Sequence, residues 1–286
     1  MRILLTGAGG FVGRRLVPML LAQGHRPHCV LRQATAMPDG ATPVVANLAA
    51  SGLATFDAPV DAVIHLAQSS RYRDFPGAVD DIFAVNVGST ARLLDLARRL
   101  GAKSFVLAST GSVYAGTDGP CREDAALHPG DFYAASKLAA ELLLKPYHAH
   151  FPACALRLFT PYGPNQQNRL VPTLIDRVRR KAPVSLDGEA DGLRLAAAYV
   201  DDVADTIIAA AEGGWDGVYN VAAPQPVSIG EIARTIGDVL GITPVFERTG
   251  RPEPAPLIPD LTRLAGKRSL QTFRGLESGL RSTIGG

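Results

Sequence analysis

Short apolar runs alternate with longer stretches of helical spacing along the first half of the chain. The runs are bounded by Gly, Pro or polar residues and predict β-strands, whereas apolar residues three and four positions apart predict helices with one buried face. The expected strands are Arg2–Thr6, His28–Arg32, Ala62–Leu66, Ser104–Ser109 and Cys154–Phe159, and the expected helices are Val12–Gln23, Asp80–Leu100 and Tyr133–His150. Near-continuously apolar strands are covered on both faces, so we expect an α/β fold with a doubly wound parallel sheet.

The character of the sequence changes after Phe159. Turn-forming residues are dense over 160–168, and prolines over 252–259. We predict a main domain over residues 1–160 plus about 199–221, in which Tyr199–Ala211 forms a helix and Val218–Val221 a strand of the main sheet. Residues from about 161–198 and 222–286 are expected to form a smaller C-terminal lobe.

A glycine-rich turn follows the first predicted strand. Residues 3–6 lead into Gly7-Ala8-Gly9-Gly10-Phe11-Val12-Gly13, where a predicted helix begins. Glycine permits positive φ and close approach of the backbone, and the N-terminus of the helix presents N–H groups and the positive end of its dipole. Strand, turn and helix in this order predict a site for the pyrophosphate of a dinucleotide at Gly7, Gly10 and Gly13. The main domain is then a Rossmann fold.

The end of the second predicted strand bears on which dinucleotide binds. An acidic residue about 20 positions after the glycine turn usually holds the ribose hydroxyls of NAD. This strand instead ends in Leu31-Arg32-Gln33, and a guanidinium without a neighbouring carboxylate favours a 2′-phosphate. We therefore expect NADP or NAD as the cofactor, with NADP slightly favoured and Arg32 at the adenosine ribose.

Tyr133 and Lys137 lie four residues apart and share one face of a predicted helix. A free phenol has a pKa of about 10, and a nearby cation favours its ionised form. We expect Tyr133 to exchange a proton with a substrate oxygen during hydride transfer, and Lys137 to lower the pKa of the phenol and hold the nicotinamide ribose. The preceding strand leads to Ser109 and Thr110, whose hydroxyls are expected at the ligand crevice.

These motifs together resemble the extended short-chain dehydrogenase/reductase superfamily, in particular its NAD-dependent epimerase/dehydratase family of nucleotide-sugar enzymes. The resemblance covers nearly the whole chain. In chain order, the similar segments are residues 6–13 (the TGxxGFxG loop), 63–67 (VIHLA), 86–90 (NVxGT), 133–137 (YxxxK), 162–164 (YGP), 199–204 (YVDDVA) and 219–221 (YNV). The resemblance implies a Rossmann domain that binds NAD(P) and a smaller lobe that binds a nucleotide sugar.

The resemblance also implies individual roles. Thr110 matches the catalytic hydroxyl, with Tyr133 as the acid/base and Lys137 as its partner. Besides the turn glycines, Arg32, Tyr133 and Lys137, the implied cofactor contacts are Phe11 and Val12 at the pyrophosphate, Asn47 and Leu48 at the adenine, Leu66, Ala67 and Gln68 at the dinucleotide linker, Leu158 and Phe159 at the nicotinamide, and Asn86 and Ala108.

Departures from the family pattern bear on the chemistry. The 4,6-dehydratases of the family place an Asp-Glu pair just after the catalytic Thr, whereas this chain has Gly111 and Ser112. Without that acid and base, removal of water lacks proton carriers, which leaves epimerisation or ketone reduction at a sugar carbon. A reductase consumes NADPH, so Arg32 tilts the prediction slightly towards reduction.

The expected substrate contacts are Thr110, Thr160, Arg194 and Arg251. Thr160 stands where the family often has Asn just before the Pro of the YGP-like turn. Arg194 is the nearest candidate for the Arg that often precedes the YVDD segment. Arg251 resembles the arginine of the lobe that grips a diphosphate, as a bidentate guanidinium can.

Composition narrows the choice of partners. The 29 basic and 27 acidic residues leave a net charge of +2, too small for a nucleic-acid binder, and no apolar run approaches the roughly 18 residues of a membrane span. The spacing of Cys29, Cys121 and Cys154 predicts neither a disulfide framework nor a metal site. We expect a cytoplasmic protein, and the resemblance suggests a homodimer through the helices Asp80–Leu100 and Tyr133–His150.

Three functions remain open at this point. The preferred one is an NAD(P)-dependent nucleotide-sugar epimerase or 4-ketoreductase. The second is an NADPH-dependent reductase of a small non-nucleotide carbonyl, such as an aldehyde, which the weakened substrate signature permits. The third is a non-catalytic NAD(P)-binding regulatory protein, against which the set of Thr110, Tyr133 and Lys137 argues.

Overall fold

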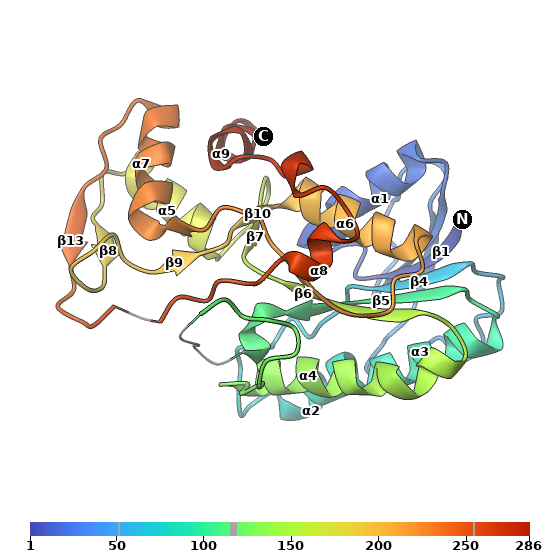
Figure 1. The fold of residues 1–286 in the computed structure, drawn as a ribbon. Helices are drawn as coiled ribbons and strands as arrows, with labels where there is room; N and C mark the ends of the chain where they lie inside the picture. The colour runs from blue at the N-terminus through green and yellow to red at the C-terminus, as the bar shows by residue number, and fades with distance from the viewer. Residues whose placement is uncertain (51, 115–118, 254) are drawn as a thin grey trace. The chain divides into compact units, whose positions relative to one another are not determined.

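The computed structural model describes residues 1–50, 52–114, 119–253 and 255–286. Its largest sheet has seven strands in the order β11-β6-β5-β4-β1-β2-β3 (Figure 1). The pairings of β1 with β2 and β4, of β2 with β3 and of β4 with β5 are all parallel. The doubly wound parallel sheet expected from the apolar runs is confirmed.

The strands of the large sheet are β1 (Arg2–Thr6), β2 (Arg26–Leu31), β3 (Thr42–Val45), β4 (Ala62–His65), β5 (Ser104–Thr110), β6 (Ala153–Leu158) and β11 (Gly217–Val221). The short strands are β7 (Pro161–Tyr162), β8 (Val184–Leu186), β9 (Arg194–Leu195), β10 (Ala198–Tyr199), β12 (Val227–Ser228) and β13 (Phe246–Arg248). The α-helices are α1 (Phe11–Ala22), α2 (Val79–Phe83), α3 (Ser89–Arg99), α4 (Phe132–Leu144), α5 (Leu170–Arg179), α6 (Val200–Glu212), α7 (Ile229–Leu240), α8 (Thr262–Ala265) and α9 (Leu276–Gly285).

The chain forms two compact units. The first contains Met1–Ala115, Ala126–Arg157 and Ala204–Tyr219, and the second contains Gly116–Ala125, Leu158–Val203 and Asn220–Gly286. Residues 119–125 therefore group with the second unit, although the sequence places them within the main domain. In this segment the side chain of Asn220 donates to Cys121 O at 2.8 Å, and the Asn220 backbone donates to Glu123 Oε1 at 2.9 Å. The assignment of a ligand to each unit stays a prediction.

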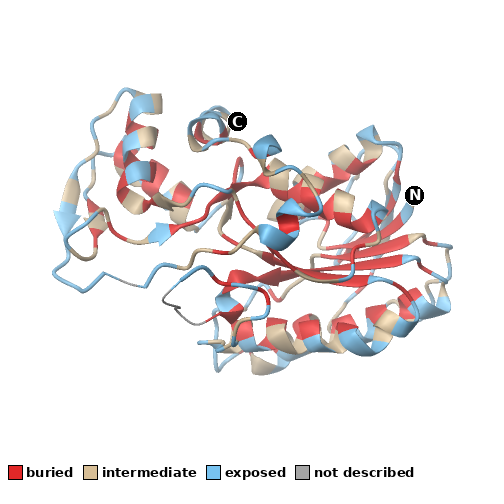
Figure 2. Cartoon of the chain, in the orientation of Figure 1, coloured by how far each residue is buried: buried red, intermediate tan, exposed pale blue. Residues whose placement is uncertain are grey.

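Helices cover both faces of the sheet in the first unit. Figure 1 shows α3 and α4 on one face and α1 and α6 on the other. Every residue of β4 and β5 is buried, and the burial colours of Figure 2 follow the strands and the inner faces of the helices. Leu93, Leu94, Leu96 and Ala97 form the buried face of α3, as their spacing predicts.

Two long predicted helices are interrupted. The helix expected over Asp80–Leu100 consists of α2, a π-helical turn at Ala84–Gly88 and α3. The buried positions in and just after the π turn are polar (Asn86, Ser89 and Thr90), so the spacing of apolar residues does not reveal it. The helix expected over Tyr133–His150 ends at Leu144 and continues as a 3₁₀ turn over Lys145–Ala149, because Pro146 has no N–H to donate to an α-helical bond.

The edge strand β3 was not predicted. It has four residues and contains Pro43, which pairs in register with Cys29 of β2. Ala46 N donates to Leu31 O at 2.8 Å, and the direction of successive N–H groups alternates along a strand. The backbone N–H groups of Thr42 and Val44 therefore point towards β2. The backbone nitrogens of Pro43 and Val45 point away from β2, to the open edge of the sheet. Proline is confined to such edges because it cannot donate to a ladder.

The described residues of the second unit form short strands and the longer helices α5, α7 and α9. α7 packs against both α5 and α9, and β8 pairs with β13. Tyr162 is fully buried, and its ring meets that of Tyr199 edge-on at 5.8 Å between centroids. A Cβ on Gly279 of α9 would lie 2.1 Å from the Tyr162 hydroxyl, so α9 docks closely enough to require glycine there.

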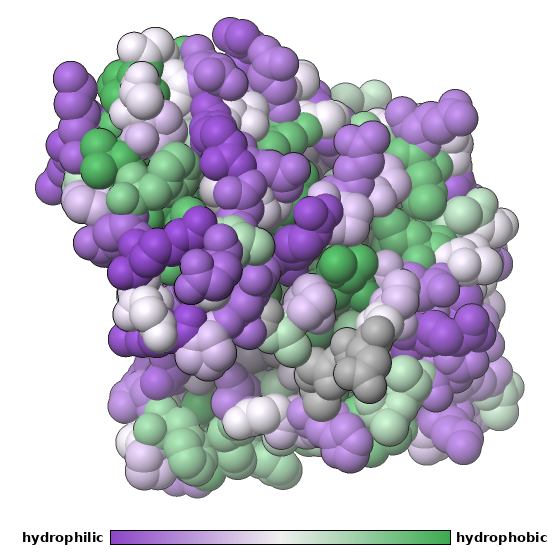
Figure 3. All heavy atoms as spheres, turned by 60° about the vertical axis from the view of Figure 1, so that its left-hand side comes forward, coloured by the Kyte–Doolittle hydropathy of each residue, from purple (hydrophilic) through white to green (hydrophobic). Residues whose placement is uncertain are grey.

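The surface is mixed in character. On the face shown in Figure 3, hydrophobic residues occur in scattered groups between hydrophilic ones. Large apolar side chains that are exposed include Val45, Phe75, Phe83, Leu142 and Val245. Across the described part of the chain, we find no helix with the length and apolar character that a bilayer crossing requires.

Candidate functional site

The glycine turn after β1 is tightly packed. Gly7 has a φ of 75°, and a Cβ there would lie 2.8 Å from the backbone N of Ala67. A Cβ on Gly13 would lie only 2.2 Å from Gly7 O. Gly7 thus needs glycine for its conformation and Gly13 for its close approach. Gly10 lies in the extended region, and its N–H closes the turn by donating to Gly7 O at 2.9 Å.

The N-terminus of α1 is suited to an anion. Gly10 is its N-cap and makes no side-chain capping bond, and the first turn carries no acidic residue. The first N–H groups of a helix, here those of Phe11, Val12 and Gly13, have no partner within the helix. These donors and the helix dipole fit a pyrophosphate, as the sequence predicts.

The residues expected at the dinucleotide linker lie beside this turn. Leu66, Ala67 and Gln68 follow β4, and all three are half-buried. Ala67 N donates to Thr6 Oγ1 at 3.2 Å, which ties the segment to the end of β1. The same hydroxyl lies 2.6 Å from Nδ1 of buried His65. His65 is thus a structural residue between β1 and β4.

The three residues expected around the adenosine lie at the ends of β2 and β3. Arg32 follows β2 directly and is exposed. Asn47 is exposed, and its Oδ1 accepts a hydrogen bond from Ala49 N at 3.0 Å. Leu48 is half-buried and lines a cavity beside α3.

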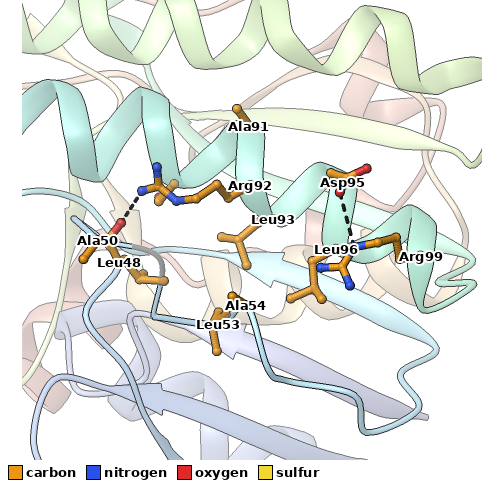
Figure 4. Close-up of a pocket in the computed structure, with 11 residues that line it drawn as sticks. Leu48, Ala50, Leu53, Ala54, Ala91, Arg92, Leu93, Asp95, Leu96 and Arg99 are labelled. Atoms are coloured by element: carbon orange, nitrogen blue, oxygen red, sulfur yellow. Dashed lines mark hydrogen bonds and ion pairs between the residues drawn. The ribbon is translucent and has the colours of Figure 1, made fainter.

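That cavity of about 340 Å³ lies between α3 and the turns after β3 (Figure 4). Described residues 46–61 contain no helix or strand that would cover this part of the sheet. Arg92 donates to Leu48 O at 2.6 Å, and Asp95 forms an ion pair with Arg99 at 3.3 Å. Thr110, Tyr133 and Lys137 are absent from the described residues that line it, so this cavity is distinct from the expected catalytic group.

The catalytic candidates come from the end of β5 and from α4. Thr110 is the last residue of β5, and its Oγ1 accepts a hydrogen bond from Ser112 N at 3.2 Å. The Tyr133 hydroxyl donates to Gln68 Oε1 at 3.0 Å. The ring of Tyr72 approaches that of Tyr133 to 5.0 Å between centroids. Asp131 caps the start of α4 by accepting from Ala134 N at 2.7 Å.

The pKa of Tyr133 differs from the sequence-based expectation. Burial raises it to about 12, a hydrogen bond with Thr110 acts in the opposite direction, and the charge of Asp131 raises it further. The net pKa thus lies above that of a free phenol in the protein without its ligands, and the lowering expected from Lys137 stays a prediction. The physical reason for the raised pKa is desolvation, which disfavours the phenolate and cannot be read from local spacing.

Lys137 is itself deeply buried, with 2% of its surface exposed. Burial lowers its pKa to about 8, and the negative charge of Glu141 acts against that shift. Lys137 thus keeps its charge at neutral pH. Its position one helical turn after Tyr133 follows from the predicted spacing.

Four further cofactor candidates are less accessible. The Asn86 side chain is buried, accepts from Ser69 N at 2.9 Å and donates to Ser136 Oγ at 2.9 Å. These bonds connect the π turn with α4 through Asn86, and its direct contact with the cofactor stays a prediction. Ala108 in β5 and Phe159 are buried, whereas Leu158 at the end of β6 is half-buried.

The predicted substrate residues of the second unit lie on turns and strand ends. Thr160 has a φ of 38°, which is unusual for a β-branched residue. Arg194 is exposed and donates to Pro226 O at 3.3 Å. Arg251 has an exposed side chain, and its backbone O accepts from Gly188 N at 2.8 Å. The guanidinium groups of Arg194 and Arg251 are thus accessible to an anion.

A buried ionic group behind the catalytic residues was missed. Glu141 pairs with Arg157 at 2.7 Å, and the two side chains are 4% and 3% exposed. Two signals in the sequence indicate it. Glu141 follows Lys137 at helical spacing, and Arg157 is the only charged residue in the apolar run of β6. The contact of Tyr72 with Tyr133 was also missed, and no local signal reveals it.

The fold and this site define an extended short-chain dehydrogenase/reductase. Within that class, residues 3–222 match the model of the NAD dependent epimerase/dehydratase family, and the chain belongs to this family. The resemblance expected from the motifs is confirmed.

Individual relatives and solved structures agree with this assignment. The chain is 30% identical to a dTDP-glucose 4,6-dehydratase of Streptomyces griseus, over 99% of this chain and 92% of that one. It is 29% identical to a probable UDP-glucuronate 4-epimerase of Rhizobium meliloti, over 73% of this chain and 67% of that one. The solved structure of MoeE5 with UDP-glucuronic acid and NAD is 27% identical, with a TM-score of 0.86 over 100% of this chain and 98% of that one. That complex holds NAD and gives no support to the NADP preference expected from Arg32.

Proposed function

We propose that this protein is an NAD(P)-dependent epimerase acting on the sugar of a nucleotide sugar. The observation that carries the proposal is the arrangement of the first unit, which joins the glycine turn, the Thr110 hydroxyl and the Tyr133–Lys137 pair in one compact body. The likeness to nucleotide-sugar enzymes favours this interpretation over a small-carbonyl reductase or a non-catalytic regulator.

The residues of the first unit fit a dinucleotide. Gly7 and Gly13 leave no space for a side chain, and the N–H groups at the start of α1 are oriented as donors. Phe11 and Val12 would hold the pyrophosphate, and Leu66, Ala67 and Gln68 the linker. When bound, the nicotinamide ring supplies the acceptor for a hydride. NAD in the MoeE5 complex favours NAD here, and Arg32 leaves NADP as the alternative to be measured.

Tyr133 carries the proton in this proposal. Its hydroxyl is bonded to Gln68 Oε1 at 3.0 Å and must exchange that partner for a sugar hydroxyl. Thr110 orients the reacting oxygen. The charge of Lys137 favours the phenolate form of Tyr133, which accepts the proton of the sugar hydroxyl as the sugar carbon gives up its hydride, although burial opposes that form in the unliganded protein. The same pair returns the proton when the sugar is reduced from its other face.

Epimerisation is favoured over dehydration by the residues just after Thr110. This segment, Gly111–Val113, forms a 3₁₀ turn without a carboxylate. The elimination of water needs an acid and a base, and Gly111 and Ser112 offer neither. The similarity to a 4,6-dehydratase over nearly the whole chain makes this difference the main point to test.

The diphosphate of the substrate is assigned to Arg194 and Arg251, and its sugar to Thr160 and Thr110. Both guanidinium groups are exposed, and a bidentate arginine recognises phosphate well. In this assignment the first unit, which contains residues 1–115, is the NAD(P)-binding domain, and the second unit binds the substrate.

One reaction mixture distinguishes the chemistries. Purified protein and either NAD or NADP are incubated with one nucleotide sugar at a time: UDP-glucose, UDP-glucuronic acid or dTDP-glucose. The sugars are followed by NMR. An epimerase produces a C4 epimer without net reduction of the cofactor. A dehydratase produces a 4-keto-6-deoxy sugar, which would refute the argument from Gly111 and Ser112. Thermal unfolding is measured in parallel. A melting temperature raised by a dinucleotide but by no nucleoside diphosphate would favour the small-carbonyl reductase.

We also propose a homodimer through the predicted helices Asp80–Leu100, which overlaps α2 and α3, and Tyr133–His150, which overlaps α4. Phe83 of α2 and Leu142 of α4 are 56% and 65% exposed, and α4 packs against both α2 and α3. Sedimentation of the wild type at micromolar concentration is expected to show a dimer, and Leu142→Glu a monomer. Val245→Glu, which changes an exposed apolar residue of the second unit, is the control and is expected to remain dimeric. A monomeric wild type would exclude the proposal.

A further inference from the structure

Glu141 lies at the centre of a buried polar group in the first unit. Arg157 Nη2 donates to Glu141 Oε2 at 2.7 Å, and Arg157 Nε lies 3.1 and 3.2 Å from the two carboxylate oxygens. The Ser109 hydroxyl also donates to Glu141. Arg157 Nη1 donates to the Tyr114 hydroxyl at 2.6 Å, and its Cζ lies 4.8 Å from the centre of that ring. The carboxylate is thus fixed from β5 and from β6.

Stability alone does not explain this group. Removing two opposite charges from water costs about as much as their attraction returns, and apolar residues often serve as well in such places. An ion pair with both side chains at most 4% exposed therefore suggests another use for the charges. Two members of this buried polar group are close in sequence to residues of the catalytic set. Ser109 precedes Thr110 in β5, and Glu141 follows Lys137 by one turn of α4.

We propose that Glu141 is a positioning residue for Lys137: from one helical turn further along α4, its fixed carboxylate supplies the negative charge that balances the buried ammonium. Arg157 and Ser109 fix the carboxylate, so Glu141 acts from a defined place rather than closing onto the lysine. The proposal rests on the function proposed above, in which the charge of Lys137 favours the phenolate form of Tyr133.

Among the described residues, the other groups that pack around Lys137 do not place a buried negative charge beside it. His65 is fully buried, and desolvation with the charge of Lys137 lowers its pKa to about 3, so it is neutral. Tyr133 is neutral because burial raises its pKa to about 12. Lys137 itself retains a pKa of about 8, with burial lowering it and Glu141 raising it. The charged residues on α2 and α3, which also pack against α4, are exposed or half-exposed: Asp80, Asp81, Arg92, Asp95, Arg98 and Arg99.

The test is a direct titration of Lys137 in the full chain without ligands. The protein has five lysines, so lysine labelled for NMR at Cε gives few signals, and Lys137→Met assigns the one of interest. The wild-type pKa is expected near 8. Glu141→Gln is expected to raise the acid dissociation constant of Lys137 about tenfold or more, because it removes the nearby opposite charge that favours the charged form of the lysine. Glu141→Asp, which keeps the charge, is expected to restore most of the wild-type value.

The control is Asp61→Asn, which also removes a carboxylate paired with an arginine of the first unit and should leave the Lys137 titration unchanged. An unchanged titration in Glu141→Gln would overturn the proposal. If that variant does not fold, the pKa of Lys137 in the wild type decides the question. A buried lysine without a counter-charge has a pKa of about 5 to 6, and such a value would also overturn it.

Calorimetry with NAD separates this test from the proposed function. If the pKa of Lys137 changes in Glu141→Gln but the protein binds no dinucleotide, the coupling between the two residues stands and the proposed function is refuted. The opposite result would retain the function and assign the support of Lys137 to other groups.

Discussion

Lys137 and Glu141 in the first unit are buried, and Glu141 is bonded to fixed partners, whereas Arg194 and Arg251 in the second unit extend from strand ends and turns into solvent. Glu141 makes its polar contacts within the folded chain, through its bonds with Ser109 and Arg157. The guanidinium of Arg194 makes a single bond to a backbone carbonyl, at 3.3 Å from Pro226 O, in the described part of the chain.

The difference agrees with the role proposed for each unit. Proton and hydride transfer need atoms placed before the substrate arrives, because preorganised charges cost no reorganisation during the reaction. Recognition of a diphosphate gains from arginines that remain hydrated until the ligand binds. Variants of the catalytic residues of the first unit should therefore change the reaction itself, whereas variants of the glycine turn and of the second unit should change folding or binding.

The largest effect is expected for Tyr133→Phe. Loss of the phenol removes the proton carrier, and general acid–base catalysis contributes typically about 10² to 10⁴-fold in rate. Turnover should fall by that factor while NAD binding, measured by calorimetry, stays unchanged. Tyr147→Phe, which removes another phenol of the same unit, should retain full turnover. Equal losses in both variants would argue against a catalytic role for Tyr133.

The next largest effect is expected for Gly13→Ala. Its Cβ would lie 2.2 Å from Gly7 O and 2.7 Å from Ala8 Cα, so the turn must move. We expect a loss of about 1 to 3 kcal/mol in the free energy of unfolding, as in other overpacked sites, together with loss of dinucleotide binding. Gly9→Ala is the matched control, because its Cβ meets only Leu31 Cδ2 at 3.8 Å. A wild-type affinity for NAD in Gly13→Ala would exclude the turn as the pyrophosphate site.

A smaller effect is expected in the second unit for Gly279→Ala. The added Cβ would lie 2.1 Å from the buried hydroxyl of Tyr162. Overpacking of about 1 to 3 kcal/mol is partly offset by the gain of about 1 kcal/mol from alanine in a helix. Thermal unfolding should show a lower midpoint for this variant and no loss for Gly285→Ala, which has open space. Adding Tyr162→Phe to Gly279→Ala should recover part of the loss, and a further decrease would contradict the contact.

The smallest effect has the opposite sign. Thr160→Asn replaces a β-branched residue at a φ of 38° by one that tolerates this conformation, so strain should be relieved. We expect a gain of up to about 1 kcal/mol in the free energy of unfolding. Thr160→Val keeps the branching and should bring no gain. A destabilised Thr160→Asn would mean that the threonine hydroxyl contributes more than its backbone costs.

The main elements of the first unit could be predicted because burial dictates their pattern. The strand predicted over Arg2–Thr6 coincides with β1, and the buried face of α3 follows its apolar spacing. The edge strand β3 was not predictable in this way, because Pro43 interrupts its pattern and little of it is buried. The π turn at Ala84–Gly88 is not predictable from apolar spacing, because the buried residues in and after it, Asn86, Ser89 and Thr90, are polar.

The candidate site was predictable to the extent that it depends on local spacing. The glycine turn and the Tyr133–Lys137 pair follow from sequence distances alone. The pKa of Tyr133 does not, because desolvation depends on the residues that pack over the ring from elsewhere in the chain. The pairing of Glu141 with Arg157 joins residues 16 positions apart, and it required the structure to bring α4 and β6 together.

The edge strand β3 also bears on self-association. An unpaired strand edge offers its N–H and C=O groups to any other extended chain and so promotes aggregation. In β3 the backbone nitrogens of Pro43 and Val45 point to the open edge of the sheet. Because proline has no N–H, Val45 supplies the single outward N–H donor of this four-residue strand. A second chain adding there would find an incomplete ladder. Pro43 thus helps to keep the sheet closed to fibril-like growth at the edge where exposed Val45 would otherwise invite it.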